Sequence, residues 1–95
     1  MLVRFFVFFI LLLAAIPITP DNLISQKLFE YHSALASNGD AESMYIVGNM
    51  YENGKGVDVD FAEAIKWYKS SAKKGNSRAK KRVRQVNRKM RLQFD

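Results

Sequence analysis

The feature that most constrains this chain is an internal repeat with a period of 36 residues. The sequence GDAES at residues 39–43 is echoed by GNSRA at residues 75–79. Looking backwards by the same offset, Trp67 falls on Tyr31 and Ala72 falls on Ala36. A period of roughly 20 to 50 residues is typical of solenoids, in which small helical or strand units stack and bury a shared core. The sequence therefore predicts a short solenoid.

Apolar residues after Asp21 recur at helical spacing, and no run of alternating β-branched residues is present. Ser43, Val47 and Tyr51 stand at i, i+4 and i+8, which predicts one packing face of a first helix. Gly48 leaves a dent beside that face, where a second helix can approach closely. We therefore expect an all-α fold, a short α-solenoid of antiparallel helix pairs.

The first helix is expected to end in a glycine-rich turn that contains Gly54 and Gly56, because glycine adopts positive φ without steric cost. Asp60 then stands at the position of an N-cap, with Glu63 at N3 as in a capping box. A second helix follows, and its packing stripe is formed by Ala64, Tyr68 and Ala72.

This pattern resembles the Sel-one-like repeat family, whose members are α-solenoids related to the tetratricopeptide repeats. The positions that carry the resemblance are Gly39, Ala41, Gly48, Tyr51, Gly54, Gly56, Asp60, Ala64, Trp67, Tyr68, Ala72 and Gly75. The resemblance implies one complete repeat at residues 39–74, preceded by a degenerate second helix at residues 21–38. Residues 75–95 depart from the pattern, because Arg84 replaces the packing glycine and Asn87 replaces the tyrosine. We expect them to form a basic amphipathic helix that caps the solenoid.

The resemblance also implies a protein–protein interaction module. In the related solenoids the first helices line the concave face, so Tyr45, Asn49 and Glu52 are expected to face a partner. Phe29 and Leu35 occupy second-helix positions of a half repeat that lacks its first-helix partner, and we expect the main docking site on that exposed surface, ahead of the basic helix. One and a half to two repeats are fewer than the roughly three that a solenoid usually needs, which favours binding to a protein partner or self-association.

The residues give no support to catalysis or to a metal site. The chain has no cysteine, and its one histidine, His32, is interpreted as a partly buried structural residue. Asp58, Asp60 and Glu63 could suggest a calcium loop, but helix capping explains the last two without a metal. The glycine pair of the turn follows no strand, so a phosphate-binding loop is not indicated. We therefore expect no enzyme, no cofactor and no small-molecule substrate.

Positive charge is concentrated near the C-terminus. Residues 73–91 contain ten of the fifteen Lys and Arg residues and no Asp or Glu. A narrow apolar stripe runs along the same helix through Ala79, Val83, Val86, Met90 and Phe94.

Two interpretations of this helix stay open. Either it serves only as the cap of the solenoid, with solvated charges, or its cations form a patch for anionic lipid headgroups or an acidic protein. The residues of this basic patch are Lys80, Lys81, Arg84, Arg88 and Arg91. Nucleic acid is not expected as a partner, because no aromatic residue is interleaved with the cations and the chain is predicted to be exported.

Residues 1–20 have the layout of a secretory signal peptide. Arg4 is followed by an unbroken apolar run over residues 5–16, and Pro17 and Pro20 interrupt it. A helix of this length covers about 18 Å, less than the roughly 30 Å hydrocarbon core, so a cleaved signal peptide is favoured over a signal anchor. Retention of the leader stays open, because no small-residue cleavage motif precedes the prolines. We expect a periplasmic or secreted protein.

The leading hypothesis is therefore an exported, non-catalytic adaptor of the Sel-one-like repeat type. The alternative is a small protein that binds an anionic membrane surface through its basic C-terminal helix.

Overall fold

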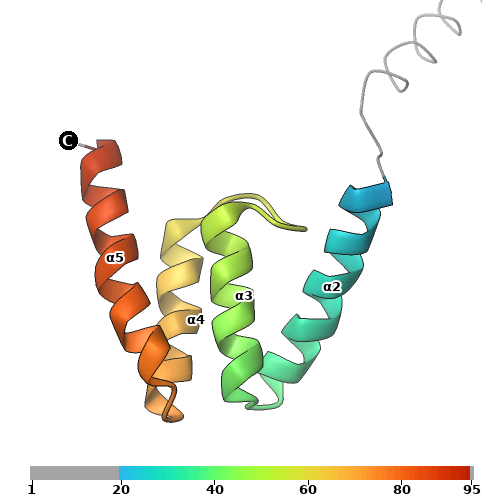
Figure 1. The fold of residues 1–95 in the computed structure, drawn as a ribbon, viewed down its shortest axis with the longest axis horizontal. Helices are drawn as coiled ribbons and strands as arrows, with labels where there is room; N and C mark the ends of the chain where they lie inside the picture. The colour runs from blue at the N-terminus through green and yellow to red at the C-terminus, as the bar shows by residue number, and fades with distance from the viewer. Residues whose placement is uncertain (1–19, 95) are drawn as a thin grey trace, which may run out of the picture.

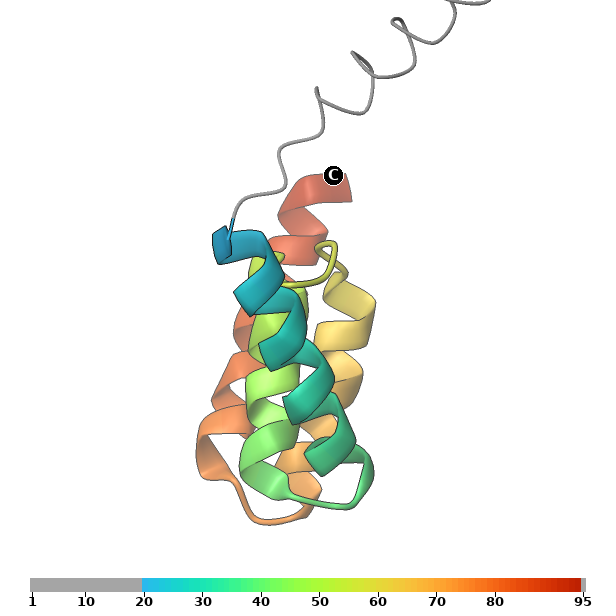
Figure 2. The ribbon, with the colours of Figure 1, turned by 90° about the vertical axis from the view of Figure 1, so that its right-hand side faces the viewer.

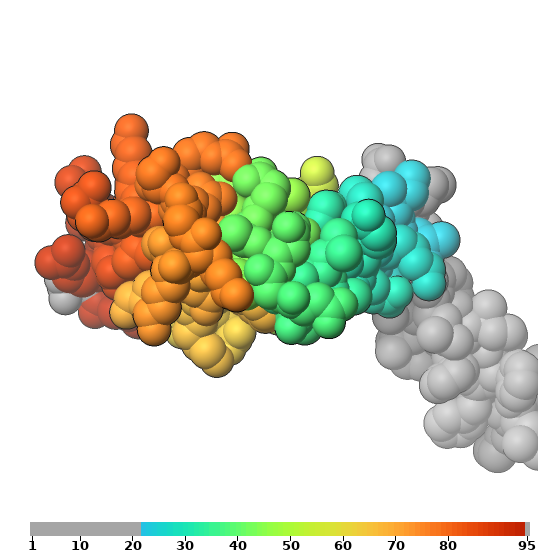
Figure 3. All heavy atoms as spheres, turned by 90° about the horizontal axis from the view of Figure 1, so that it is seen from below, coloured from blue at the N-terminus to red at the C-terminus, as the bar shows by residue number. Residues whose placement is uncertain are grey.

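A computed structural model describes residues 20–94, which form four helices in an antiparallel row (Figure 1). The helices are α2 (Pro20–Ser37), α3 (Ala41–Asn53), α4 (Phe61–Lys73) and α5 (Ser77–Phe94). Each helix packs against the next one along the chain, and a view from below shows the same order (Figure 3). The predicted all-α solenoid of helix pairs is confirmed. The leader predicted at residues 1–20 lies outside the described residues, apart from its last residue.

The helix boundaries repeat at the period of the sequence. Helix α2 ends at Ser37 and α4 ends at Lys73, while α3 begins at Ala41 and α5 begins at Ser77. The turns also match, since the amide of Asp40 donates to the carbonyl of Leu35 and the amide of Asn76 to that of Ser71, both at 3.1 Å. Helices α2 and α4 are thus second helices of successive repeats, and α3 and α5 are first helices. Seen along the row, α3 and α5 lie to one side of α4 (Figure 2).

The turn between α3 and α4 is built by the predicted capping residues. Gly54 ends α3 in the left-handed conformation at φ +68°, and its amide donates to the carbonyl of Met50. Asp60 caps α4, because its side chain accepts a 3.0 Å hydrogen bond from the amide of Glu63. The N-cap and the turn are therefore confirmed.

The reciprocal half of the predicted capping box is not formed. The amide of Asp60 donates to the carbonyl of Tyr51 at 2.9 Å, so it is not available to the carboxylate of Glu63. That carboxylate instead accepts a 3.0 Å hydrogen bond from Lys66. The reason is that the turn folds Asp60 back onto the last turn of α3, where a free carbonyl satisfies its amide.

Two apolar clusters fill the spaces between the helices. The cluster between α4 and α5 contains Ala64, Ile65, Tyr68, Ala79 and Val86, and the cluster between α2 and α3 contains Ala36, Met44 and Val47. Val83 and Met90 pack against the first cluster and Trp67 against the second. Most of the predicted stripe of α5 thus packs on the core, but Phe94 is 81% exposed and does not.

Gly48 allows α3 and α4 to approach closely, as its position predicts. A Cβ atom at this residue would lie 2.8 Å from Cδ1 of Tyr68, which is closer than real Cβ contacts. Tyr68 itself has no exposed surface, so it cannot move away into solvent. The glycine therefore creates the space that the tyrosine ring fills.

Candidate functional interface

Glu52 holds three helices together through one buried carboxylate. Its Oε1 accepts hydrogen bonds from the hydroxyl of Tyr68 at 2.8 Å and from Nη2 of Arg82 at 3.0 Å. Its Oε2 accepts a hydrogen bond from Nζ of Lys89. The side chain of Glu52 is 0% exposed. The prediction that Glu52 faces a partner is wrong, because α5 covers this part of α3 and supplies cations to it.

The ionisation of this cluster follows from its burial and its hydrogen bonds. Burial acts to raise the pKa of Glu52, but the hydrogen bonds from Lys89 and Tyr68 outweigh it, and the pKa lies below its ordinary value. Burial raises the pKa of Tyr68 to about 12, with the neighbouring carboxylate of Glu52 acting in the same direction. At neutral pH the cluster therefore contains an ionised glutamate and a neutral tyrosine.

Sequence reasoning missed the part played by Arg82 and Lys89. Neither belongs to the predicted basic patch, yet both bind Glu52. They stand seven residues apart and so lie on one side of α5. Two cations seven residues apart on the last helix, together with a single carboxylate near the end of the first helix of the repeat, are the sequence signal that could have predicted this pairing.

The solvent-facing part of the α3/α5 surface is organised around Tyr45. The guanidinium carbon of Arg78 lies 4.7 Å from the centroid of the Tyr45 ring, a distance typical of a cation–π contact. The carboxylate of Glu42 binds the same guanidinium, and this hydrogen bond raises the pKa of Arg78. Tyr45 is half-buried, and its ring lies 5.4 Å from that of Tyr68. The predicted contact residue Asn49 is also half-buried, one helical turn further along α3.

The two predicted docking residues of α2, Phe29 and Leu35, differ in what they contact. Phe29 packs edge-on against Tyr51 with 5.3 Å between ring centroids, so it belongs to the contact with α3 and not to an open face. Leu35 is half-buried. The exposed apolar residues of this helix are Leu28 at 40% and Tyr31 at 60%, together with Leu23 and Ile24. Phe29 is therefore a partly buried contact between α2 and α3.

The predicted basic patch is the set of cations of α5 that the fold leaves unpaired. Helix α5 carries eight Lys and Arg residues and no Asp or Glu. Three of them, Arg78, Arg82 and Lys89, form ion pairs with α3. Within residues 20–94 the other five are exposed and form no ion pair: Lys80, Lys81, Arg84, Arg88 and Arg91. At about 100° per residue, all five project within an arc of about 100° on the side opposite the buried stripe.

The described part of the chain offers no catalytic or metal-binding arrangement. No group of three or more His, Asp or Glu side chains in residues 20–94 could hold a metal ion. Nδ1 of His32 and the hydroxyl of Ser33 are buried without a hydrogen-bond partner. None of the helices in the same range is both long and apolar enough to cross a membrane.

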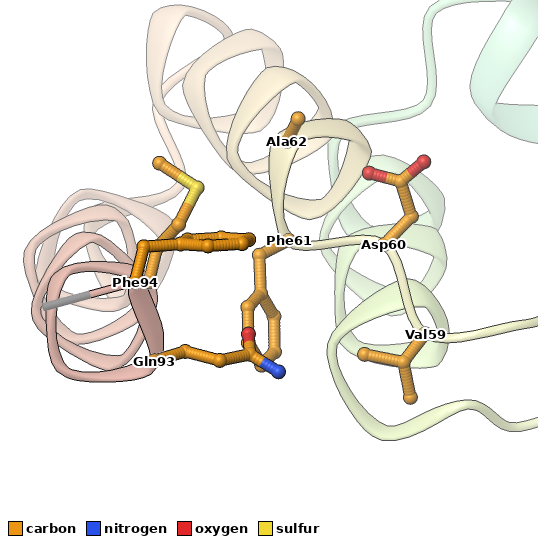
Figure 4. A pocket seen from close by; sticks show the side chains of 7 residues that line it. Val59, Asp60, Phe61, Ala62, Gln93 and Phe94 are labelled. Atoms are coloured by element: carbon orange, nitrogen blue, oxygen red, sulfur yellow. The ribbon is translucent and has the colours of Figure 1, made fainter.

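A hollow of about 390 Å³ lies between the start of α4 and the end of α5 (Figure 4). The side chains of Phe61, Gln93 and Phe94 line it, together with Met90 and Val59. Its only carboxylate belongs to Asp60, which caps α4. The one ionisable side chain among the lining residues of this mainly apolar hollow is thus used as a helix cap.

Comparison with known proteins identifies the central helix pair. Residues 41–76 match the family described as the Sel1 repeat. The chain contains a Sel1 repeat. This match confirms the resemblance found in the sequence, and the Sel1 repeat supports a protein–protein interaction module.

Relatives of the chain are much longer proteins. A segment of 63 residues is 43% identical to DAP3-binding cell death enhancer 1 of Rattus norvegicus and covers 66% of this chain but 12% of the relative. The protein of the same name from Mus musculus is 38% identical over 63 residues, again 66% of this chain and 12% of the relative. Chitin synthase regulatory factor 3 of Schizosaccharomyces pombe is 44% identical over 58 residues, which cover 61% of this chain and 6% of that protein. No solved structure matches the chain.

Proposed function

We propose that this Sel1 repeat protein is a non-catalytic adaptor that binds a protein partner on the α3/α5 face. The observation that carries the proposal is the contact between Tyr45 and Arg78 on that face. The ring of Tyr45 packs against the ring of Tyr68 and contacts the guanidinium of Arg78. That guanidinium forms an ion pair with Glu42. Tyr and Arg side chains that are already ordered lose little conformational entropy on binding, and both are enriched at the centres of protein interfaces.

Two further facts support this function. The rat and mouse relatives are named for binding another protein. Two of the three buried polar residues of the described chain, Glu52 and Ser71, join helices by hydrogen bonds. These buried hydrogen bonds therefore hold α3 against α4, and so help to maintain the interaction face.

A pull-down with the immobilised chain from extracts of its source cells tests the proposal, with the captured proteins identified by mass spectrometry. Tyr45→Ser should remove a specific partner, while Lys55→Ser, in the exposed turn away from the face, should retain it. The partner should also survive a wash in about 0.5 M salt, where the Debye length is a few ångströms and purely electrostatic binding is weakened. Equal recovery with both variants would contradict the proposal.

The proposal includes export by the leader at residues 1–20. It is supported by the apolar run that follows Arg4 and ends at the prolines. Fractionation of cells that express the full chain, compared with a variant in which Arg4 and the apolar residues Phe8 and Leu12 are replaced by Glu, tests it. The full chain should be accessible to protease outside the cytoplasm, and the variant should stay protected inside. Protection of both chains would contradict export.

A further inference from the structure

A second hollow lies between the end of α4 and the start of α5. It has a volume of about 340 Å³. Ala72 and Val83 form its apolar floor, and both are half-buried. Four cations surround this floor: Lys69, Lys73, Lys80 and Arg84. An apolar floor inside a ring of positive charge is an uncommon combination for a surface that only faces water.

The internal repeat shows which side chain occupies the equivalent site between α2 and α3. Thirty-six residues earlier, Ala36 and Val47 occupy the positions of Ala72 and Val83. There Trp67 packs against the apolar cluster that contains both of them, and they are 1% and 0% exposed. The α4/α5 hollow is therefore the counterpart of the site that Trp67 occupies between α2 and α3, and no side chain of residues 20–94 fills it.

The rim of the hollow differs from its counterpart in charge. Lys80 stands where Met44 stands in the filled site, and Arg84 stands where Gly48 admits the ring of Tyr68. None of the four rim cations forms an ion pair with another residue in the range 20–94. A helix that docks here must therefore supply carboxylates, because desolvating unpaired Lys and Arg side chains is costly.

A second copy of the chain does not meet this requirement. Its α2 helix places Tyr31 at the position of Trp67, but the neighbouring side chains that would face a first helix are Leu28, His32 and Leu35. They offer no carboxylate to Lys80 or Arg84. A flat lipid surface would neutralise the cations and leave the hollow empty.

We propose that the α4/α5 hollow binds an acidic amphipathic helix of another protein. The helix packs one aromatic side chain on Ala72 and Val83, as Trp67 packs on the cluster of Ala36 and Val47, and its carboxylates pair with Lys80 and Arg84. This site lies on a face other than the α3/α5 face. Failure at either face is therefore measured separately, because Tyr45→Ser does not touch the hollow.

The probe is a fluorescently labelled peptide with the sequence of residues 60–74 carrying Tyr68→Glu and Ser71→Glu, at the positions equivalent to His32 and Leu35 that face a first helix, together with Lys66→Glu and Lys69→Glu. This peptide keeps the helix that fills the counterpart site, its N-cap and its tryptophan, and it is acidic. Its control is the same peptide with Trp67→Ala. Fluorescence anisotropy on titration with the full chain should show binding, and the control peptide should bind at least tenfold more weakly.

Two double variants of the full chain carry the same change in charge. Lys80→Glu with Arg84→Glu alters the rim, and Lys81→Glu with Arg88→Glu alters exposed cations of α5 outside the hollow. The first pair should weaken binding of the peptide at least tenfold, and the second less than threefold. Thermal melts verify that both variants fold. If the charge reversals unfold the chain, the paired Gln variants serve for the same comparison.

Three results would overturn the inference. Equal weakening by the two double variants would indicate general electrostatic attraction. Vesicles containing anionic phospholipid that bind the chain and displace the peptide, with the same dependence on Lys80 and Arg84, would make this a membrane site. Self-association that excludes the peptide, detected by sedimentation, would make a second copy the occupant.

Discussion

The hydroxyl of Tyr68 and the carboxylate of Glu52 are joined by a 2.8 Å hydrogen bond in the interior of the protein. This bond connects α4 to α3, and Arg82 and Lys89 connect the same carboxylate to α5. The last helix therefore attaches to the Sel1 repeat by a buried charge as well as by apolar packing. The consequences can be measured.

Replacement of Glu52 by Ala should destabilise the protein by about 2 to 3 kcal/mol. Breaking a buried ion pair costs roughly 3 to 5 kcal/mol, and the cost is lower here because Arg82 and Lys89 reach solvent. Glu63→Ala is the control, since its pair with Lys66 is largely exposed and should change the free energy of unfolding by less than about 1 kcal/mol. Urea unfolding measures both. Equal effects would contradict a special role for Glu52.

The contribution of Glu52 to stability should disappear in acid. Its pKa is lowered in the folded state, so its stabilisation is complete above the ordinary value of 4.5 and is lost as pH falls through the lowered pKa. The difference in unfolding free energy between the native chain and Glu52→Gln should thus be constant from about pH 7 to 5 and shrink below about pH 4. A difference that does not depend on pH would contradict the ionised carboxylate.

One tyrosine should ionise at a higher pH than the other three. The chain has four tyrosines, and burial raises the pKa of Tyr68 to about 12. Since a raised pKa stabilises the fold below the unfolded value near 10, stability should fall as pH rises from about 10 towards 12. Titration followed by the ultraviolet absorbance of tyrosinate should show this late step, and Tyr68→Phe should remove it. A late step that persists in Tyr68→Phe would assign it to another tyrosine.

Gly48→Leu should destabilise the protein by about 1 to 3 kcal/mol or more through overpacking. A Cβ atom at this position would already lie 2.8 Å from the ring of Tyr68 and 3.2 Å from the carbonyl of Ala64. Asn49→Leu, at the neighbouring half-buried position, provides the control and should cost less. A thermal melt in which Gly48→Leu equals the native chain would mean that α3 and α4 do not pack at this residue.

Gly56→Ala should loosen α2 as well as strain the turn. Its φ is +74°, and an added Cβ would lie 2.2 Å from the carbonyl oxygen of Ser25. Gly75→Ala is a matched control, because Gly75 also has positive φ but no atom within 4 Å of an added Cβ. Hydrogen exchange should show faster exchange of α2 amides in Gly56→Ala only. The same exchange rates in both variants would mean that the turn does not hold α2.

The local structure of this chain follows from its sequence. The 36-residue period gives the spacing of the helices, from the end of α2 at Ser37 to the end of α4 at Lys73. Gly54 and Asp60 determine where α3 ends and α4 begins, because a left-handed C-cap and a side-chain N-cap act within a few residues of the chain. Gly48 identifies the face on which the two helices meet.

The tertiary structure decided which faces of the helices are buried and which meet solvent. Helical spacing places Glu52 on a side of α3, but whether that side meets solvent depends on α5, whose rotation is fixed by the packing of Ala79 and Val86. The cations that bind Glu52 lie 30 and 37 residues away in the sequence. Phe29 of α2 likewise packs on Tyr51 of α3, which lies 22 residues further along the chain. Such contacts join segments that are distant in the chain, so local periodicity cannot specify them, and only the packed helices determine which charges are buried and which remain free.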